Sequence, residues 1–171
     1  MSALGKTMPE PGKTLQDHFA VVFFAAALLC AAAEIVIWGT PLVETVLAWI
    51  LLVNIGVQGL LAGVSHWYEP SAKKVAEKLG WAPGSPFQRE VAAADAAFGV
   101  LGILAFFIRD NFLVATVIGA SVMLFLMGIG HVLDLRKNQN DSVYNAGTVV
   151  WFDLLLPVLM CILLVMGKAG W

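Results

Sequence analysis

The sequence predicts an all-α integral membrane protein, a bundle of about five transmembrane helices. Three observations lead to this prediction. First, 60% of the 171 residues are hydrophobic and only 13% are charged, whereas soluble domains carry about 45–50% apolar and about 25% charged residues. Second, five apolar runs reach or approach the length of about 20 residues that a spanning helix needs. Third, backbone groups in lipid must be hydrogen-bonded internally, so such runs form helices.

The chain is predicted to form one transmembrane domain, residues 19–171, after a cytoplasmic tail of residues 1–18. The apolar run that begins at Phe19 is longer than the roughly 7–15 residues of a signal-peptide core, so we interpret it as a retained span. A formal net charge of −2 does not favour nucleic acid as a partner. The predicted spans are 19–39, 43–67, 87–108, 112–134 and 144–167, with an amphipathic interfacial segment at about 70–80.

The third span has a recognisable helix start. Ser85 is expected to be the N-cap, Pro86 the first helical residue, and Gln88 the residue that closes a capping box.

The distribution of basic residues orients the bundle, because cytoplasmic loops of membrane proteins carry an excess of Lys and Arg. Five spans place the N-terminal tail and the loops after spans 2 and 4 on the same side. That side holds Lys6, Lys13, Lys73, Lys74, Lys78, Arg89, Arg136 and Lys137. The opposite side holds only Arg109 and Lys168. The sequence therefore predicts a multi-pass protein of the cell (inner or plasma) membrane with a cytoplasmic N-terminus and an outside C-terminus.

Spans 2 and 4 end in the same polar pattern. Gly63, His66 and Glu69 are spaced as Gly-x-x-His-x-x-acid, and Gly128, His131 and Asp134 repeat this spacing. Each pattern is followed by a polar loop and then by a span with carboxylates near its start. Spans 2–3 and 4–5 are therefore predicted to be two copies of one helical hairpin.

The first candidate site is a metal site near the cytoplasmic side of the bundle. Residues three apart share a helix face, so each histidine lies beside an acid. Di-iron and di-manganese bundles use Glu-x-x-His pairs with further carboxylates, and imidazole with carboxylate suits iron, manganese or zinc. The predicted ligands are His66, Glu69, Glu90, His131, Asp134 and Asp153.

Three alternatives remain open. The two histidines, on different spans, could ligate a b-type haem. Acids inside the membrane could instead line a proton, cation or solute pathway, since intramembrane ionisable groups are functional candidates. The pathway candidates are Glu34, Asn54, Gln58, Asp95 and Asp153. Finally, the polar residues could simply satisfy one another in a non-catalytic subunit of a larger complex.

No phosphate loop, nucleophile elbow, dinucleotide fingerprint or HExxH motif occurs in the chain. The sequence thus gives no positive sign of an enzyme. The lipid bilayer is the expected partner, together with further copies of the chain or a larger membrane complex.

Short motifs also resemble a known family. The stretch from Gly84 through Ser85-Pro86-Phe87-Gln88-Arg89-Glu90, the Gly130-His131 pair, and Asn145-Ala146-Gly147 with Asp153 are similar to an uncharacterised family of small bacterial and archaeal membrane proteins. The resemblance covers roughly spans 2 to 5. It implies a multi-spanning fold, draws attention to Glu90, His131 and Asp153, and brings no assigned activity.

Overall fold

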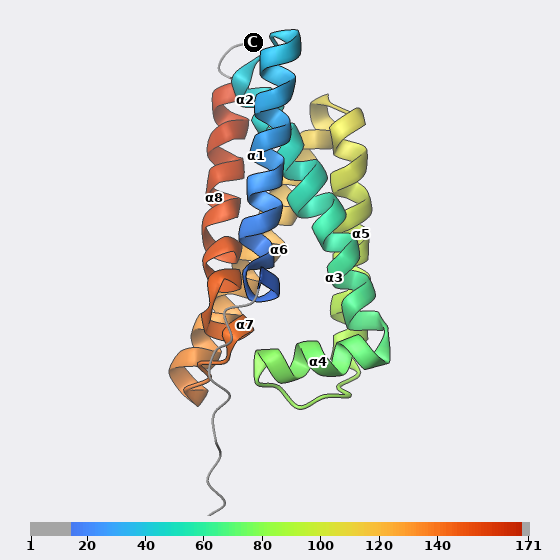
Figure 1. The fold of residues 1–171 in the computed structure, drawn as a ribbon, viewed down its shortest axis with the longest axis vertical. Coiled ribbons are helices and arrows are strands. Elements are labelled where there is room, and N and C mark those ends of the chain that lie inside the picture. The colour runs from blue at the N-terminus through green and yellow to red at the C-terminus, as the bar shows by residue number, and fades with distance from the viewer. Residues whose placement is uncertain (1–14, 169–171) are drawn as a thin grey trace, which may run out of the picture.

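The computed structural model describes residues 15–168, and this part of the chain is all-helical, with no strand. Within it, five helices are long and apolar enough to cross a membrane, which confirms the predicted fold class (Figure 1). The elements are a 3-10 helix Leu15–His18, α1 Phe19–Trp38, α2 Leu42–Ile50, a π-helix Leu51–Val57, α3 Gln58–Trp67, α4 Glu69–Leu79, α5 Phe87–Phe107, α6 Asp110–Asn138, α7 Val143–Ala146 and α8 Thr148–Lys168. Residues 1–14 of the predicted tail, with Lys6 and Lys13, lie outside the described range.

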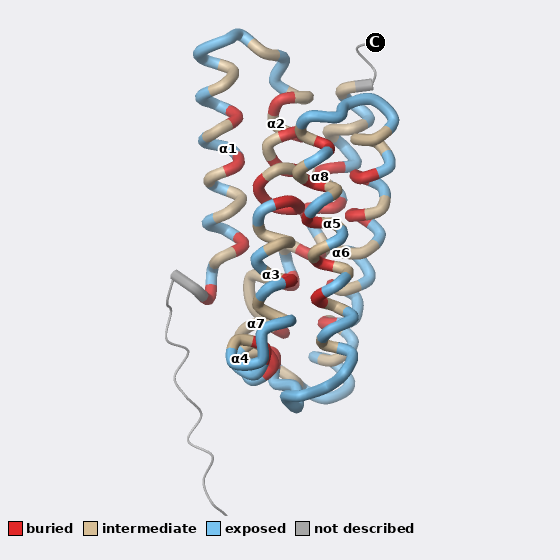
Figure 2. Tube along the Cα trace, turned by 90° about the vertical axis from the view of Figure 1, so that its right-hand side faces the viewer, coloured by how far each residue is buried: buried red, intermediate tan, exposed pale blue. Residues whose placement is uncertain are grey.

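The first span ends at a glycine turn. Gly39 has φ 65°, a left-handed conformation that favours glycine, and its N–H donates to the carbonyl of Ile35 at 2.8 Å. After this turn α2 runs back along α1. In Figure 2, α1 stands at one side of the molecule, apart from α3 and α5. Its neighbours are α2, the π-helix and α8.

The second span is not a uniform helix. It consists of α2, the π-helical segment and α3, and the N–H of Gln58 donates to the carbonyl of Val53, five residues back. The 43–67 prediction did not include this change. A π-helical turn inside an α-helix is rare and often lies at a functional site. Here the segment carries Asn54, a buried amide in the membrane interior.

Small residues join α3 and the π-helix to α5. A Cβ atom added to Gly99 would come within 2.8 Å of the Leu60 backbone nitrogen. One added to Gly102 would lie 2.6 Å from the nitrogen of Gly56. The two backbones therefore approach as closely as glycine allows, which is a common way of packing membrane helices. On the other side of the molecule α6 packs against α8.

The apolar core lies where α2, the π-helix, α6 and α8 meet. Its most buried side chains include Ile50, Leu51, Val117 and Met160, all with 0% exposure. Large apolar side chains are also exposed on the outer surfaces of the spans, including Leu29 at 72%. A soluble protein rarely shows such surfaces, whereas lipid is a suitable solvent for them.

Helix α4 lies across one end of the bundle, roughly at right angles to the spans (Figure 1). It buries Ala72, Ala76 and Leu79, while Lys73 and Lys74 are exposed. The helix is therefore amphipathic, with its apolar face turned to the rest of the protein.

Two local predictions differ from the structure. The 144–167 span is divided at Gly147 into α7 and α8, and any side chain at Gly147 would overlap the carbonyl of Val143. The expected capping box is also wrong, because α5 begins at Phe87 without a side-chain cap. The amide of Gln88 instead donates to the carbonyl of Ala72, at 2.7 Å, and so ties α5 to α4.

Candidate functional site

Three buried polar residues gather where α6, α7 and α8 meet near the α4 end of the bundle. His131 of α6 is 6% exposed, Asn145 of α7 is 0% exposed, and Asp153 of α8 is 8% exposed. His131 Nδ1 lies 2.8 Å from Asn145 Oδ1, and His131 Nε2 lies 3.8 Å from Asp153 Oδ2. The break at Gly147 makes this arrangement possible, because it lets α7 place Asn145 beside His131 while α8 continues to Asp153.

Asn145 determines which nitrogen of His131 carries hydrogen. Its Nδ2 donates to the carbonyl of Asn140 at 2.7 Å, so its Oδ1 must be the atom that faces His131. An amide oxygen only accepts, and therefore His131 Nδ1–H donates to it. In a neutral imidazole with hydrogen on Nδ1, the other nitrogen, Nε2, has a free lone pair.

That lone pair points toward an acid. Asp153 Oδ2 is buried and has no hydrogen-bond partner among the described residues. If both groups were deprotonated, an imidazole lone pair and a carboxylate would face each other with no hydrogen between them. An unpaired buried carboxylate is costly in a low-dielectric interior. The pair is thus suited to hold one proton, either on Asp153 or on His131.

The spans carry a second buried acid. Asp95 of α5 is 8% exposed. A Cβ added to Gly59 would lie 3.2 Å from the Asp95 carbonyl, so α3 packs directly on this part of α5.

Trp81, in the turn after α4, covers His131. Its indole ring is stacked on the imidazole, with ring centroids 5.8 Å apart and an angle of 12° between planes. The indole Nε1–H donates to Asp134 Oδ2 at 2.9 Å. Asn140 donates to the same Asp134 oxygen and, at 2.8 Å, to the carbonyl of Leu79 at the end of α4. The end of α4 is thereby fixed over the buried pair.

An ion pair also holds α4 in place. Lys78 Nζ donates to Asp17 Oδ1 at 2.8 Å and to the Tyr144 hydroxyl at 3.3 Å. Burial lowers the pKa of Lys78, but the hydrogen bonds to Asp17 and Tyr144 outweigh it and leave the pKa above its ordinary value of 10.5. The Lys78 ammonium is therefore charged at neutral pH. The ion pair with Asp17 would be lost only as the pH rises through the raised pKa of Lys78.

The six predicted metal ligands are not gathered in one place. His66 is paired with Gln88, whose Nε2 lies 3.3 Å from His66 Nδ1. Glu69 is exposed and makes an ion pair with Arg89 at 3.3 Å, while Glu90 is exposed. Of the six, the structure brings together His131 and Asp153, while Asp134 accepts a hydrogen bond from Trp81, which stacks on His131. Among the described residues, no group of three or more His, Cys, Asp or Glu side chains is placed to hold a metal ion.

The pathway candidates divide into two groups. Asn54 is 5% exposed, its Nδ2 donates to Gln58 Oε1 at 3.4 Å, and its own Oδ1 has no partner in the described part of the chain. These two amides lie on the second span, next to the Gly59 contact with α5. Glu34 lies elsewhere and accepts a hydrogen bond of 2.7 Å from Trp49 Nε1.

Sequence reasoning missed two residues of the site. Asn145 belongs to a motif of the family resemblance but is not among the predicted ligands, and Trp81 belongs to none of the candidate sets. The signal for Asn145 was its position at the start of a predicted span that also carries an acid. Nothing in the sequence indicated that Trp81 would stack on His131, since the contact joins residues from distant helices.

The chain matches one protein family. No curated protein and no solved structure matches the chain. A family model described as a family of unknown function, DUF6790, matches residues 17–170, which include every helix from α1 to α8. The chain therefore belongs to the DUF6790 family, a family of unknown function.

Proposed function

We propose that this chain carries a proton-exchange site inside the membrane and serves in proton transport or proton-coupled transport. The observation that supports this proposal most directly is the unpartnered Oδ2 of Asp153, 3.8 Å from Nε2 of His131. Asn145 holds His131 in the tautomer whose lone pair faces that oxygen. Ionisable residues inside membrane proteins commonly mark proton relays.

The proton would move from this pair to other buried polar groups of the spans. His131 and Asp153 would share a proton at the α4 end. Asp95 of α5, also a buried acid, would be the next acceptor. Beyond it, Gln58 and the unpartnered oxygen of Asn54 continue the polar stripe along the second span. Amides do not ionise, so they would carry the proton only through hydrogen-bonded water.

Trp81 would control access to this site. Trp81 is 47% exposed, and one face of its ring is stacked on His131. In the arrangement described above it separates the buried pair from the aqueous side of α4. Displacement of Trp81, together with the end of α4, would open the pair to water.

A metal ion is the second candidate, supported by the same unpartnered oxygen. His131 Nε2 and Asp153 Oδ2 are two donors of types that iron, manganese and zinc accept. Two donors are fewer than such ions usually require from a protein. A b-type haem between His66 and His131 is less well supported, because each ring nitrogen Nδ1 is already engaged with a different helix partner.

The proposed setting is the plasma (inner) membrane, with the N-terminus in the cytoplasm. The basic residues of α4, of the start of α5 and of the end of α6 support this orientation. A five-span subunit offers little room for a solute pathway, so the working form is proposed to be a homo-oligomer or part of a larger membrane complex.

The test combines spectroscopy with flux. In lipid nanodiscs, infrared difference spectra recorded across pH should show a carboxyl C=O band that titrates in wild type. The band should be lost or shifted in Asp153→Asn and Asp95→Asn, but not in the matched control Glu90→Gln, which changes an exposed acid of α5. In proteoliposomes, an imposed membrane potential should drive proton uptake that falls at least about tenfold in Asp153→Asn.

Each outcome has a definite meaning. If the band does not depend on Asp153, the proton site is wrong. If the band behaves as expected but liposomes with the wild-type protein take up no protons, the proton-exchange site is correct and the chain does not transport protons without a coupled solute. Near-stoichiometric iron, manganese or zinc in the purified protein, lost in His131→Gln, would replace the proton proposal with the metal site.

A further inference from the structure

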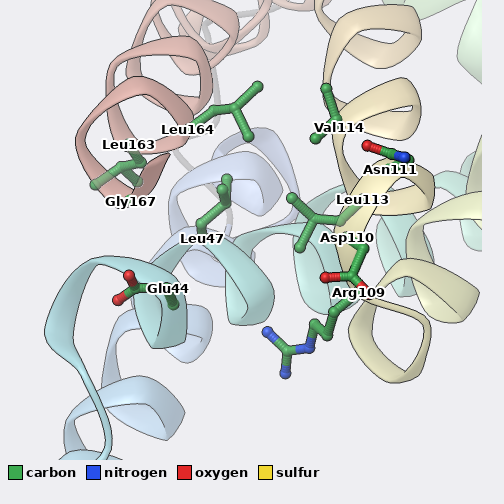
Figure 3. Close-up of a pocket in the computed structure, with 10 residues that line it drawn as sticks. All are labelled: Glu44, Leu47, Arg109, Asp110, Asn111, Leu113, Val114, Leu163, Leu164 and Gly167. Atoms are coloured by element: carbon green, nitrogen blue, oxygen red, sulfur yellow. The ribbon is translucent and has the colours of Figure 1, made fainter. Parts of the chain in front are cut away.

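A pocket of about 610 Å³ lies at the end of the bundle opposite α4, between α2, α6 and α8. Figure 3 shows its walls, which come from the beginning of α2, the turn before α6 together with the first turns of α6, and the last turns of α8. Pockets of about 300–1,000 Å³ are typical of small-molecule sites. It is separate from the His131–Asp153 pair, so the inference below does not depend on the proposed function.

The pocket is polar at its rim and apolar further in. Glu44, Arg109, Asp110 and Asn111 stand at or near the ends of their helices, where the spans leave the membrane. One turn deeper along the same three helices the lining is apolar. The apolar lining residues are Leu47, Leu113, Val114, Leu163 and Leu164.

This gradient follows the direction of a membrane lipid. Glu44 and Leu47 are three residues apart on α2, which corresponds to about 4.5 Å along a helix axis. Asp110 and Leu113 have the same spacing on α6, and Gly167 and Leu164 have it on α8. A ligand would therefore meet charge at the level of the headgroups and leucine at the level of the first acyl carbons.

The rim carries both signs of charge. Arg109 lies over the ring of Phe106, with its guanidinium carbon 5.2 Å from the ring centroid, and makes no ion pair within the described residues. Glu44 is on a different helix, and in Figure 3 its carboxylate and the guanidinium lie on the same side of the pocket. A cation and an anion thus stand on the same side of the pocket and make no ion pair with each other.

We infer that this pocket binds a zwitterionic phospholipid with a primary amine, such as phosphatidylethanolamine, with Arg109 on the phosphate and Glu44 on the ammonium. An anionic lipid would suit Arg109 but would bring its negative charge toward Glu44 and Asp110. A quaternary ammonium headgroup has no N–H to donate to Glu44. Phosphate and ammonium contacts of this kind are charge-assisted hydrogen bonds, stronger than neutral ones.

The test is native mass spectrometry of the protein released from nanodiscs that contain equal parts of phosphatidylethanolamine, phosphatidylcholine and phosphatidylglycerol. Wild type should retain phosphatidylethanolamine preferentially. Arg109→Gln and Glu44→Gln should each lower its retention about tenfold, the effect of losing one charge-assisted hydrogen bond. The matched control Arg136→Gln removes an exposed arginine near the other end of α6 and should leave retention unchanged.

Other results would overturn the inference. Equal retention of the three lipids, or a preference for phosphatidylglycerol, contradicts the assignment of Glu44. A dimer without lipid that dissociates in Arg109→Gln would show that a second copy fills the pocket. A second kind of variant, Val114→Trp, leaves Arg109 and Glu44 unchanged and fills the apolar part of the pocket. It should exclude the lipid while the melting temperature stays near that of wild type.

Discussion

At the scale of single residues, the surroundings of His131 fix where hydrogen is carried. Asn145 has one donor contact, to the carbonyl of Asn140, and one acceptor contact, to His131 Nδ1. Its amide orientation is therefore determined by a backbone group that cannot rotate away. The result is that His131 presents its unprotonated nitrogen to Asp153, which is the arrangement needed for exchange of a proton between them.

Replacement of Asn145 tests this account. Asn145→Leu keeps the size of the side chain but leaves His131 Nδ1 and the Asn140 carbonyl without partners. A buried polar group without a partner costs about 1–3 kcal/mol, so the free energy of unfolding should fall by about that amount or more. Nitrogen NMR of the imidazole should show hydrogen on Nδ1 in wild type and a mixture of tautomers in the variant.

The control for this variant is Asn138→Leu. Asn138 is exposed and donates to Asp134 Oδ1. Its replacement should change the free energy of unfolding by less than about 0.5 kcal/mol and leave the His131 signals as they are. Equal loss of stability in the two variants, with no change in the tautomer of His131, would show that Asn145 does not orient the ring.

The sequence could identify His131 and Asp153 because an ionisable residue within an apolar span is visible without any structure. It could not identify their partners. Asn145 and Trp81 lie in connecting segments, where polar and aromatic residues are common, and their roles depend on the tertiary fold. The predicted metal ligands do not lie in one place for the same reason: His66 is on α3, which packs against α5, whereas His131 is on α6, which packs against α8.

At the scale of elements, the closest helix contact joins the π-helical segment to α5. A Cβ on Gly102 would lie 2.6 Å from the Gly56 nitrogen and 2.7 Å from the Leu51 carbonyl oxygen, and both are backbone atoms that cannot move aside. This contact holds the segment that carries Asn54. Hydropathy predicts that a span exists here, but a helix of altered winding has no signature in the apolar pattern. The π-helix therefore could not be predicted.

The effect of a single methyl group measures how tightly these helices pack. Gly102→Ala should lower the free energy of unfolding by about 1–3 kcal/mol, because overpacking forces the backbones apart. Gly130→Ala is the matched control, since nothing lies within 4 Å of a Cβ at that helical position. It should be neutral or stabilising by up to about 1 kcal/mol, as alanine favours helix more than glycine does. Thermal unfolding in one detergent compares the two.

The proposed duplication of spans 2–3 and 4–5 stays a prediction. In both halves the motif glycine approaches the following span: Gly63 approaches Ala92 and Ala96 of α5, and Gly128 approaches Asp153 and Leu154 of α8. The partners of the two histidines differ, however, with Gln88 in one half and Asp153 with Asn145 in the other. If the halves share an origin, only in the second does the histidine of the motif face a buried acid.

At the scale of the whole molecule, the two ends of the bundle differ in charge. The structure places six basic residues at the α4 end, on α4, the start of α5 and the end of α6: Lys73, Lys74, Lys78, Arg89, Arg136 and Lys137. Among the basic side chains that the structure describes, Arg109 stands at the opposite end, in the turn between α5 and α6. The number of spans is predictable from sequence because each span depends on its own hydropathy. The difference in charge between the two ends is the basis for predicting how the spans are oriented.

The asymmetry predicts that the α4 end faces the cytoplasm. In a variant without Cys30 and Cys161, single cysteines at Lys73 and at Asn111 would lie at opposite ends of the bundle. A thiol reagent that does not cross membranes should label Asn111→Cys in intact cells and Lys73→Cys only after permeabilisation. The reverse pattern would place the His131–Asp153 pair near the outside and Trp81 toward the external medium. In that case a relay through these residues would take up protons from outside the cell, and α4 would control their entry rather than their release.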